Sequence, residues 1–206
     1  MKILVIGASG RVGQDLVREL QAKGDHVVAA SRHPQNIGDK SIVIDLHAEA
    51  DVIAQHMQGF DAVYFTAGSR GKDTIGTDLD GAIKTMQAAQ LANVHRYIML
   101  SAAFALDRTK WSAPGIAAIK DYYIAKHYAD RFLINDTTLK YTILQPGTLT
   151  ETPATGTTSF TVAAGSNSIA DVAAVLAELV HADNTIGKVI TMHSGETAIP
   201  DAVATV

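Results

Sequence analysis

The stretch that decides the fold is Lys2-Ile3-Leu4-Val5-Ile6-Gly7-Ala8-Ser9-Gly10-Arg11-Val12-Gly13. Its first half is an apolar run typical of a buried β-strand. Three glycines spaced three apart then interrupt the run, and apolar residues afterwards recur at helical spacing. The stretch therefore predicts a strand, a tight loop and a helix, in that order.

This loop has the composition of an anion-binding site. Glycines let the backbone approach a pyrophosphate closely, and the free N–H groups at a helix start point toward the anion. Two residues separate Gly7 from Gly10, whereas one residue separates the first two glycines of the common G-x-G-x-x-G pattern. The alternative is an ordinary tight turn between a strand and a helix. The expected contacts to the anion come from Gly7, Ser9, Gly10, Arg11, Val12 and Gly13.

The composition bounds the class of protein. The chain has 206 residues, 47% of them hydrophobic and 18% charged, which favours one folded domain. The formal net charge of −4 disfavours a general nucleic-acid or anionic-membrane surface. The absence of cysteine excludes disulfide and thiolate chemistry. Because Met1 leads directly into the first strand and no apolar run could cross a bilayer, we expect a cytoplasmic protein without a signal peptide.

Strands alternate with helices over two thirds of the chain. After the first strand, further strands are expected at residues 26–30, 41–45, 61–66, 97–101 and 141–144. Helices are expected from the glycine loop to Gly24 and at residues 48–58, 77–92 and 115–133. Such alternation implies parallel βαβ units. We therefore expect an α/β fold, a Rossmann-like doubly wound parallel sheet, in a single domain over residues 1–206.

The last quarter of the chain has a different composition. Residues 148–168 are rich in Thr, Ser, Gly and Ala, which predicts a loop with one short strand at 159–163, lying over the ligand crevice. A helix at 169–181 and a strand at 188–192 are expected to follow. We expect segments of about 148–165 and 187–206 to form the substrate side of the same domain.

The residues after the second strand bear on the choice of cofactor. A carboxylate there selects NAD, whereas a hydroxyl and a guanidinium accommodate the 2′-phosphate of NADP. The chain has Ser31 and Arg32 at this place, which predicts NADP(H), with NAD(H) the less favoured cofactor. The alternative is that Arg32 is a surface arginine. Asp45 and Leu46, after the third strand, are candidates for the adenine edge, although Asp45 could equally be a solvated strand end.

Tyr122 and Lys126 stand four apart on a predicted helix and so share a face. In a catalytic interpretation Lys126 binds ribose hydroxyls and lowers the pKa of the phenol, and Tyr122 protonates a carbonyl as hydride arrives. Ser101, at the end of the fifth strand, would hydrogen-bond the same oxygen. The alternatives are a tyrosine at the rim of the core and a plain strand-ending serine. The eight histidines show no metal-binding spacing, so no metal is expected.

These motifs together resemble the short-chain dehydrogenase/reductase superfamily. The similar segments are the glycine loop, Thr66-Ala67-Gly68, residues 78–102, residues 122–126, residues 141–147 and residues 194–200. The chain looks most like the small atypical group of NAD(P)H-binding proteins similar to biliverdin-IXβ (flavin) reductase and to NmrA-like regulators.

The resemblance also implies roles for individual residues. It places Thr66, Ala67 and Gly68 at the adenine-ribose side of the cofactor and Pro146 next to the nicotinamide. It places Ser101, Tyr122 and Lys126 at the catalytic positions. Asp78 stands where the superfamily often has an asparagine.

The function that these features favour is NADP(H)-dependent reduction of a small carbonyl, quinone or flavin-like acceptor by hydride transfer. One alternative is a non-catalytic protein that senses NADP(H) and regulates a partner. Another is a sugar-nucleotide epimerase or dehydratase, for which the C-terminal part is short. The expected partner is a small-molecule substrate, with no nucleic acid and no membrane, in a monomer or homodimer.

Overall fold

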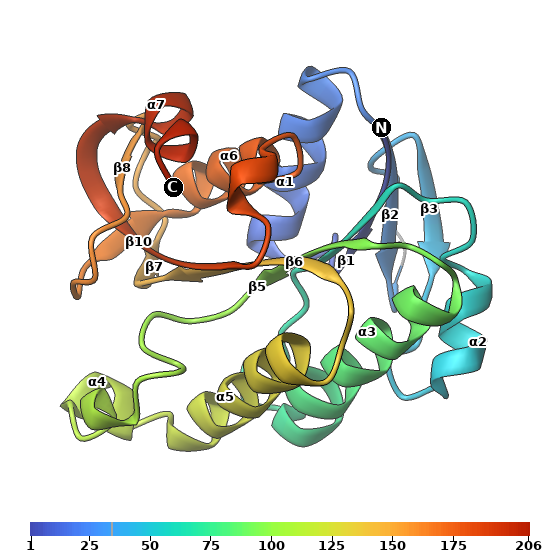
Figure 1. The fold of residues 1–206 in the computed structure, drawn as a ribbon, viewed down its shortest axis with the longest axis horizontal. Helices are drawn as coiled ribbons and strands as arrows, with labels where there is room; N and C mark the ends of the chain where they lie inside the picture. The colour runs from blue at the N-terminus through green and yellow to red at the C-terminus, as the bar shows by residue number, and fades with distance from the viewer. Residues whose placement is uncertain (34) are drawn as a thin grey trace.

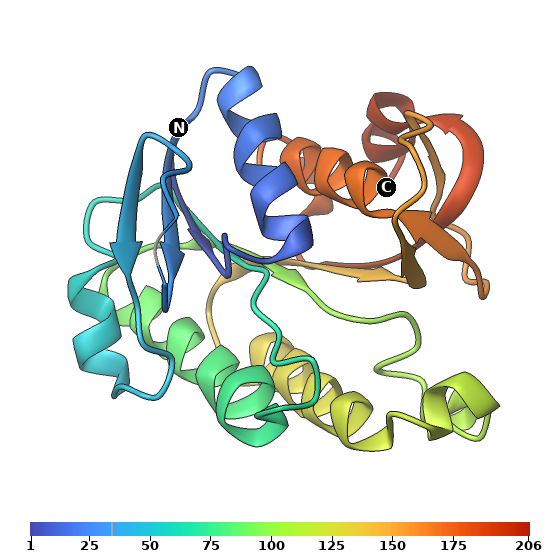
Figure 2. The same cartoon turned by 180° about the vertical axis from the view of Figure 1, so that it is seen from behind.

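The predicted first strand is β1 (Lys2–Ile6), and it lies within an eight-stranded sheet. The structure is a computed structural model that describes residues 1–33 and 35–206 (Figures 1 and 2). The strand order is β3-β2-β1-β4-β5-β6-β10-β8, with every pair parallel except the last. The other strands are β2 (His26–Ser31), β3 (Lys40–Val43), β4 (Ala62–Phe65), β5 (Arg96–Leu100), β6 (Lys140–Pro146), β8 (Thr157–Ser159) and β10 (Lys188–Ala198). The predicted doubly wound sheet is therefore confirmed.

Helices cover both faces of the sheet. Figures 1 and 2 show α1 (Arg11–Ala22) and α6 (Ile169–Leu179) on one face, with α2 (Ala50–Gln55), α3 (Ala82–Leu91) and α5 (Lys120–Asn135) on the other. In β1, Ile3 and Val5 pack toward α1 and α6, and Leu4 and Ile6 pack toward α2, α3 and α5. Because both faces are buried, the central strands are apolar throughout rather than alternating.

The strand order changes direction at β1, whose two neighbours are β2 and β4. Connections from β1 and β4 therefore leave on opposite faces, and a crevice opens beyond their carboxyl ends. The glycine loop that follows β1 lies at this point. The topology alone puts the glycine loop next to the ends of β4, β5 and β6.

Two predicted helices are each divided in the structure. The helix expected at 77–92 begins as a π-helix, η1 (Thr74–Gly81), and only then continues as α3. The carboxylate of Asp73 caps η1 by accepting from the backbone N–H of Gly76 at 3.2 Å. The helix expected at 115–133 is α4 (Pro114–Ala117) followed by α5, because Ile119 leaves the helical conformation at φ −126° and ψ 39°.

The predicted strand at 159–163 was misplaced. Residues 157–159 form β8 because they pair with β10, which continues to Ala198, six residues beyond its predicted end. The adjoining β7 (Thr148–Thr150) and β9 (Ser166–Ser168) pair with each other in parallel. After β10 comes α7 (Ile199–Ala204), which was not predicted. The structure also has the short 3-10 helices η2 (Arg108–Lys110) and η3 (Asp183–Thr185).

Candidate active site

A single large cavity occupies the crevice beyond the carboxyl ends of β1, β4, β5 and β6. Its volume is about 1450 Å³, and it runs from the glycine loop past α5 to residues 162–165. Pockets for one small ligand usually measure roughly 300–1,000 Å³. The cavity therefore has room for a dinucleotide and a second, smaller molecule.

The glycine loop is held by close backbone contacts. Gly7 has φ +87°, and a Cβ there would lie 2.4 Å from the backbone nitrogen of Ala67 on β4's loop. A Cβ at Gly13 would lie 2.3 Å from the carbonyl oxygen of Gly7, so Gly13 lets α1 pack against the loop. A Cβ at Gly10 would meet one neighbouring atom within 4 Å, at 3.2 Å, which leaves this position open toward the cavity. These contacts match the turn, close-approach and helix-packing roles of glycines in pyrophosphate loops.

The N-terminus of α1 is free to bind an anion. Its cap, Gly10, supplies no side-chain hydrogen bond, so the first N–H groups of the helix have no partner from a capping side chain. Arg11 and Val12 line the cavity at this end. The guanidinium of Arg11 is paired at 2.7 Å with the exposed carboxylate of Glu151, a contact that a bound anion would have to replace or extend.

The loops after β2 and β3 reach the same cavity. Ser31 and the exposed side chain of Arg32 line it beside the glycine loop. Leu46 lines it as well, whereas the Asp45 carboxylate turns to His47, whose backbone N–H and ring Nδ1 lie 3.0 and 3.2 Å from Oδ1. The hydrogen bond from the His47 backbone and the nearby His47 ring lower the pKa of Asp45.

Most of the predicted site residues lie around this one cavity. Two do not: Gly13 sits behind the loop, and Asp45 belongs to the cluster with His47. The predicted residues that line the cavity are Gly7, Ser9, Gly10, Arg11, Val12, Ser31, Arg32, Leu46, Thr66, Ala67, Gly68, Ser101, Tyr122, Lys126 and Pro146.

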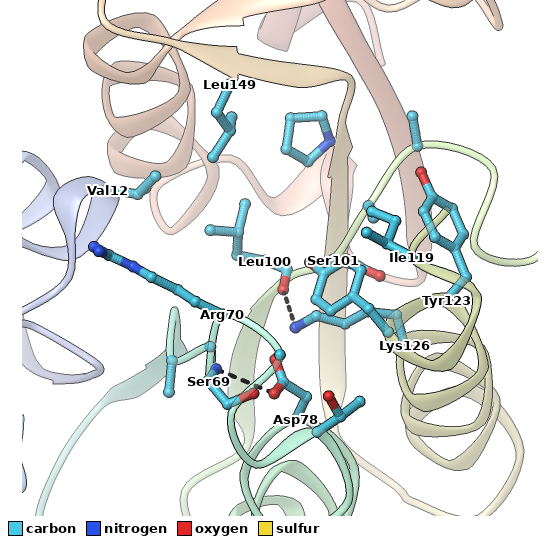
Figure 3. A pocket seen from close by; sticks show the side chains of 18 of the residues that line it. Val12, Ser69, Arg70, Asp78, Leu100, Ser101, Ile119, Tyr123, Lys126 and Leu149 are labelled. Atoms are coloured by element: carbon cyan, nitrogen blue, oxygen red, sulfur yellow. Dashed lines mark hydrogen bonds between the residues drawn. The ribbon is translucent and has the colours of Figure 1, made fainter. Parts of the chain in front are cut away.

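Lys126 is a buried ammonium on the floor of the cavity. Its Nζ donates to the carbonyl oxygen of Leu100 at 3.1 Å, as Figure 3 shows, and lies 5.7 Å from the ring centroid of Tyr122. Burial lowers the pKa of Lys126, and the nearby carboxylates of Asp78 and Asp130 oppose that shift. An ammonium has three hydrogens to donate, so Lys126 retains donors for a ligand.

The effect of Lys126 on the pKa of the Tyr122 phenol stays a prediction. Burial, followed by the carboxylate of Asp78, raises the pKa of Tyr122 well above its ordinary value. At neutral pH Tyr122 therefore keeps its proton, which suits a proton donor. Its neighbour Tyr123 packs edge-on against Trp111, with ring centroids 6.1 Å apart.

Ser101 is tied to a carboxylate that the sequence analysis did not single out. Its Oγ donates to Oδ2 of Asp130 at 2.7 Å, and Nε2 of Gln145 donates to the same oxygen at 2.9 Å. Asp130 is fully buried, and burial raises its pKa to about 6 against the hydrogen bonds from Ser101 and Gln145. A signal was present, because Asp130 lies four residues after Lys126 and so continues the Tyr122–Lys126 face of the helix.

The raised pKa of Asp130 gives a stability prediction for Asp130→Asn. Because the folded protein holds this proton more tightly than the unfolded chain, Asp130 favours folding below its ordinary pKa of 3.8, and that contribution is lost as pH rises through about 6. At pH 8 the variant is expected to gain up to about 3 kcal/mol in free energy of unfolding, at about 1.4 kcal/mol per pKa unit. Urea unfolding at pH 8 and pH 4 tests this, since the gain should shrink at pH 4. A variant equally destabilised at both pH values would contradict it.

Two further polar residues on the η1 side of the cavity were not assigned a role in advance. Asp78 is fully buried on η1, where its Oδ2 accepts from the backbone N–H of Ser69 at 3.1 Å. Arg70 has the left-handed backbone φ of 55°, and Figure 3 shows its side chain extending across the cavity toward Val12. A guanidinium therefore reaches toward the loop end of the cavity from the side opposite α1.

Apolar side chains gather at another part of the cavity, called here its apolar end, where Lys110, Lys120 and Asp121 also line the wall. Phe104, Leu149 and the exposed side chains of Ile119 and Val162, 51% and 77% accessible, line it. Exposed apolar side chains grouped at a cavity mouth indicate a ligand-binding surface. The cavity thus combines a cationic loop end, the Tyr122–Lys126 pair and an apolar end.

Comparison with known proteins identifies the family: the chain belongs to a family of NAD(P)H-binding proteins, whose model matches residues 7–183. It is 37% identical over 216 residues to the "Uncharacterized sugar epimerase YhfK" of Bacillus subtilis strain 168, covering 98% of this chain and 99% of that protein. A nicotinamide dinucleotide is accordingly the cofactor class of this site.

Two solved structures share the whole fold. One is the oxidoreductase ylbE from Lactococcus lactis, with a TM-score of 0.95 and 43% identity, covering 100% of this chain and 96% of that one. The other is a candidate NAD-dependent epimerase/dehydratase from Bacillus halodurans, with a TM-score of 0.90, 33% identity and full coverage of both chains.

The part of the chain that the structure describes has neither a metal-ligand cluster nor a membrane-spanning helix. Within residues 1–33 and 35–206 there is no cluster of three or more His, Cys, Asp or Glu side chains arranged for a metal ion. Within the same residues, every helix is too short or too polar to span a bilayer.

Proposed function

We propose that the protein is an NADP(H)-dependent oxidoreductase that reduces a small carbonyl, quinone or flavin-like acceptor. The observation that carries the proposal is the Tyr122–Lys126 pair, which lines the same cavity as the glycine loop. A protonated phenol beside an ammonium with free donors is suited to protonating an acceptor and binding a ribose.

Different residues around the cavity would bind different parts of the cofactor. The N–H groups at the start of α1 would bind the pyrophosphate, with Arg11 and Arg70 as nearby cations. Ser31 and Arg32 would bind a 2′-phosphate, and Lys126 the ribose next to the nicotinamide. The cofactor supplies the hydride.

Residues 66–68 would lie on the adenine-ribose side of the bound cofactor, and Pro146 would border the nicotinamide. Residues 66–68 follow β4 and Pro146 ends β6, and the carboxyl ends of both strands open on the cavity.

The proton reaches the acceptor from the Tyr122 phenol. Because burial keeps the phenol protonated, its hydroxyl can donate to an acceptor oxygen as negative charge develops there. Lys126 stays beside the ring of Tyr122, held by the carbonyl oxygen of Leu100.

The lining of the apolar end favours a flat, apolar acceptor over a sugar nucleotide. Ile119, Leu149, Val162 and Phe104 offer apolar surface to a flat ring system.

The test is NADPH oxidation, followed at 340 nm, against a panel of aldehydes, ketones, quinones and free flavins. We expect turnover with at least one class, and more with the flat aromatic acceptors than with aliphatic ketones. Tight NADPH binding without turnover of any acceptor would support the sensing alternative instead.

An Arg32→Ala variant tests the preference for NADP(H). Loss of a guanidinium bound to a 2′-phosphate is expected to weaken NADPH binding about 10- to 100-fold, because a charged hydrogen bond contributes about 1.5–3 kcal/mol. NADH binding should stay within about a factor of two. Calorimetry with both cofactors measures this, and Arg18→Ala, an exposed arginine paired with Asp15, is the matched control. An unchanged preference for NADPH in Arg32→Ala would show that Arg32 is a surface arginine.

Epimerisation is the second candidate, because two of the similar proteins carry epimerase names. An epimerase must keep its reduced cofactor while the intermediate turns over. Dilution of the cofactor-loaded protein distinguishes the two: a reductase exchanges NADP(H) freely, whereas an epimerase retains it through gel filtration.

A further inference from the structure

The hydrogen of the Ser101 hydroxyl is already in use. Ser101 follows β5 and lines the cavity, and its Oγ donates to Oδ2 of Asp130 at 2.7 Å. A serine hydroxyl has one hydrogen and two lone pairs. While Asp130 takes that hydrogen, Ser101 can only accept from a ligand. This is the opposite of the donor role that carbonyl reduction would ask of it.

The carboxyl group of Asp130, which contacts Ser101, has surroundings that suit both its ionised and its protonated form. Its Oδ2 accepts from Ser101 and from Gln145, while its buried Oδ1 has no hydrogen-bond partner among the residues the structure describes. An unpartnered buried oxygen disfavours the carboxylate. Burial raises the pKa of Asp130 to about 6, so both states are accessible near neutral pH. The protonated carboxyl can donate to the Ser101 oxygen, which turns the serine hydrogen toward the cavity.

The charges around Asp130 are few. Lys126 on the same helix favours its ionised form, and the neutral phenol of Tyr122 lies one turn further along. Asp78 reaches the cluster from η1 and interacts with Lys126 and Tyr122. The strands packed against this face of the helix, β5 and β6, contribute neutral partners, a hydroxyl and an amide.

We propose that Asp130 is a positioning residue that decides whether Ser101 offers a hydrogen or a lone pair to the ligand. In the ionised state Ser101 accepts from a ligand hydroxyl or N–H. In the protonated state it donates to a carbonyl oxygen. The site therefore recognises the oxidised acceptor best in one protonation state and the reduced alcohol best in the other. The functional part of this inference rests on the proposed reductase activity.

The first experiment needs no turnover. Asp carboxyl carbons are labelled with ¹³C in the cofactor-free protein, and the Asp130 signal is assigned by its loss in Asp130→Asn. We expect it to titrate with a midpoint at about pH 6. In Ser101→Ala the midpoint should rise by about one pH unit, because the carboxylate loses a donor. A midpoint below pH 5, or one that Ser101→Ala leaves unchanged, would overturn the coupling.

The second experiment measures kcat/KM for NADPH-dependent reduction of 9,10-phenanthrenequinone between pH 5.5 and 8. In the wild type it should fall about tenfold as pH rises through the Asp130 midpoint, and in Asp130→Asn it should be flat. The matched control is Asp171→Asn. That buried carboxylate accepts from the backbone N–H groups of Thr155 and Gly156 outside the cavity, so its variant should keep the fall. A fall that persists in Asp130→Asn would overturn the role of Asp130.

The two experiments separate this inference from the proposed function. If no acceptor of the panel is reduced, the reductase proposal fails. The carboxyl titration still decides whether Asp130 controls the Ser101 hydrogen. If reduction occurs but shows no Asp130-dependent pH step, the reductase proposal stands and the inference fails.

Discussion

A Tyr122→Phe enzyme is expected to lose about 100- to 10,000-fold in kcat for carbonyl reduction, the usual range for removing a positioned proton donor. The phenol of the half-buried Tyr122 lines the cavity with its pKa raised, so it keeps its proton at neutral pH. Cofactor affinity should stay within about a factor of three, because the phenylalanine keeps the ring beside Lys126. Steady-state kinetics with the best carbonyl acceptor, together with fluorescence titration of NADPH, measure both quantities.

The control for this variant is Tyr128→Phe on the same helix. Tyr128 is 50% exposed and faces away from the cavity, so its variant should keep wild-type kcat. Reduction of a free flavin is a second comparison, since hydride transfer to a flavin need not take a side-chain proton and should survive in Tyr122→Phe. Full kcat for carbonyl reduction in Tyr122→Phe would remove the phenol from the mechanism.

A Gly13→Ala variant is expected to lose at least about 100-fold in cofactor affinity and about 1–3 kcal/mol of stability, the usual cost of overpacking. The added Cβ would lie 2.3 Å from the Gly7 carbonyl oxygen and 2.9 Å from the Ala8 Cα. Both neighbours are backbone atoms and cannot rotate away, so either the loop or the start of α1 must move. The backbone N–H groups at the start of α1 then no longer point toward the pyrophosphate. Calorimetry with NADPH and thermal unfolding report the two effects.

Gly10→Ala separates affinity from stability. Its Cβ would meet one atom within 4 Å, at 3.2 Å, and would otherwise extend into the cavity. We expect its unfolding temperature to stay close to that of the wild type while NADPH affinity falls about tenfold or more. If Gly13→Ala bound NADPH as tightly as the wild type does, this account of the loop would be wrong.

The sheet could be predicted from the sequence because its central strands are apolar throughout and alternate with amphipathic helices. The divided helices could not. Residues 74–92 keep helical spacing across the change from π- to α-helix, so periodicity does not show where the change occurs. Ile119 similarly continues an apolar stripe although its side chain leaves the helix to line the cavity. The short strands after residue 148 depend on pairing with β10, which a local pattern does not contain.

The cavity residues could be named in advance wherever they follow a strand, because parallel strands bring their carboxyl ends to one edge. This reasoning grouped the glycine loop, Ser31, Ser101 and Pro146. It failed for Asp130, whose importance comes from its contact with Ser101 on another element. It also failed for Arg70, which reaches the cavity through a left-handed backbone conformation that a non-glycine residue rarely adopts.

The long strand β10 has a consequence for how this protein could acquire a new acceptor. Its first half pairs with β6 in parallel, from Lys188 opposite Thr142 to Met192 opposite Pro146, and its second half pairs antiparallel with β8. Val162, at the cavity mouth, follows β8 and is held near β10 by a hydrogen bond between Thr161 and His193. The segment from β8 to Val162 is therefore part of the main sheet. Exchanging it for another segment would break the pairing of β8 with β10. Specificity in this scaffold would have to change through single side chains along the wall.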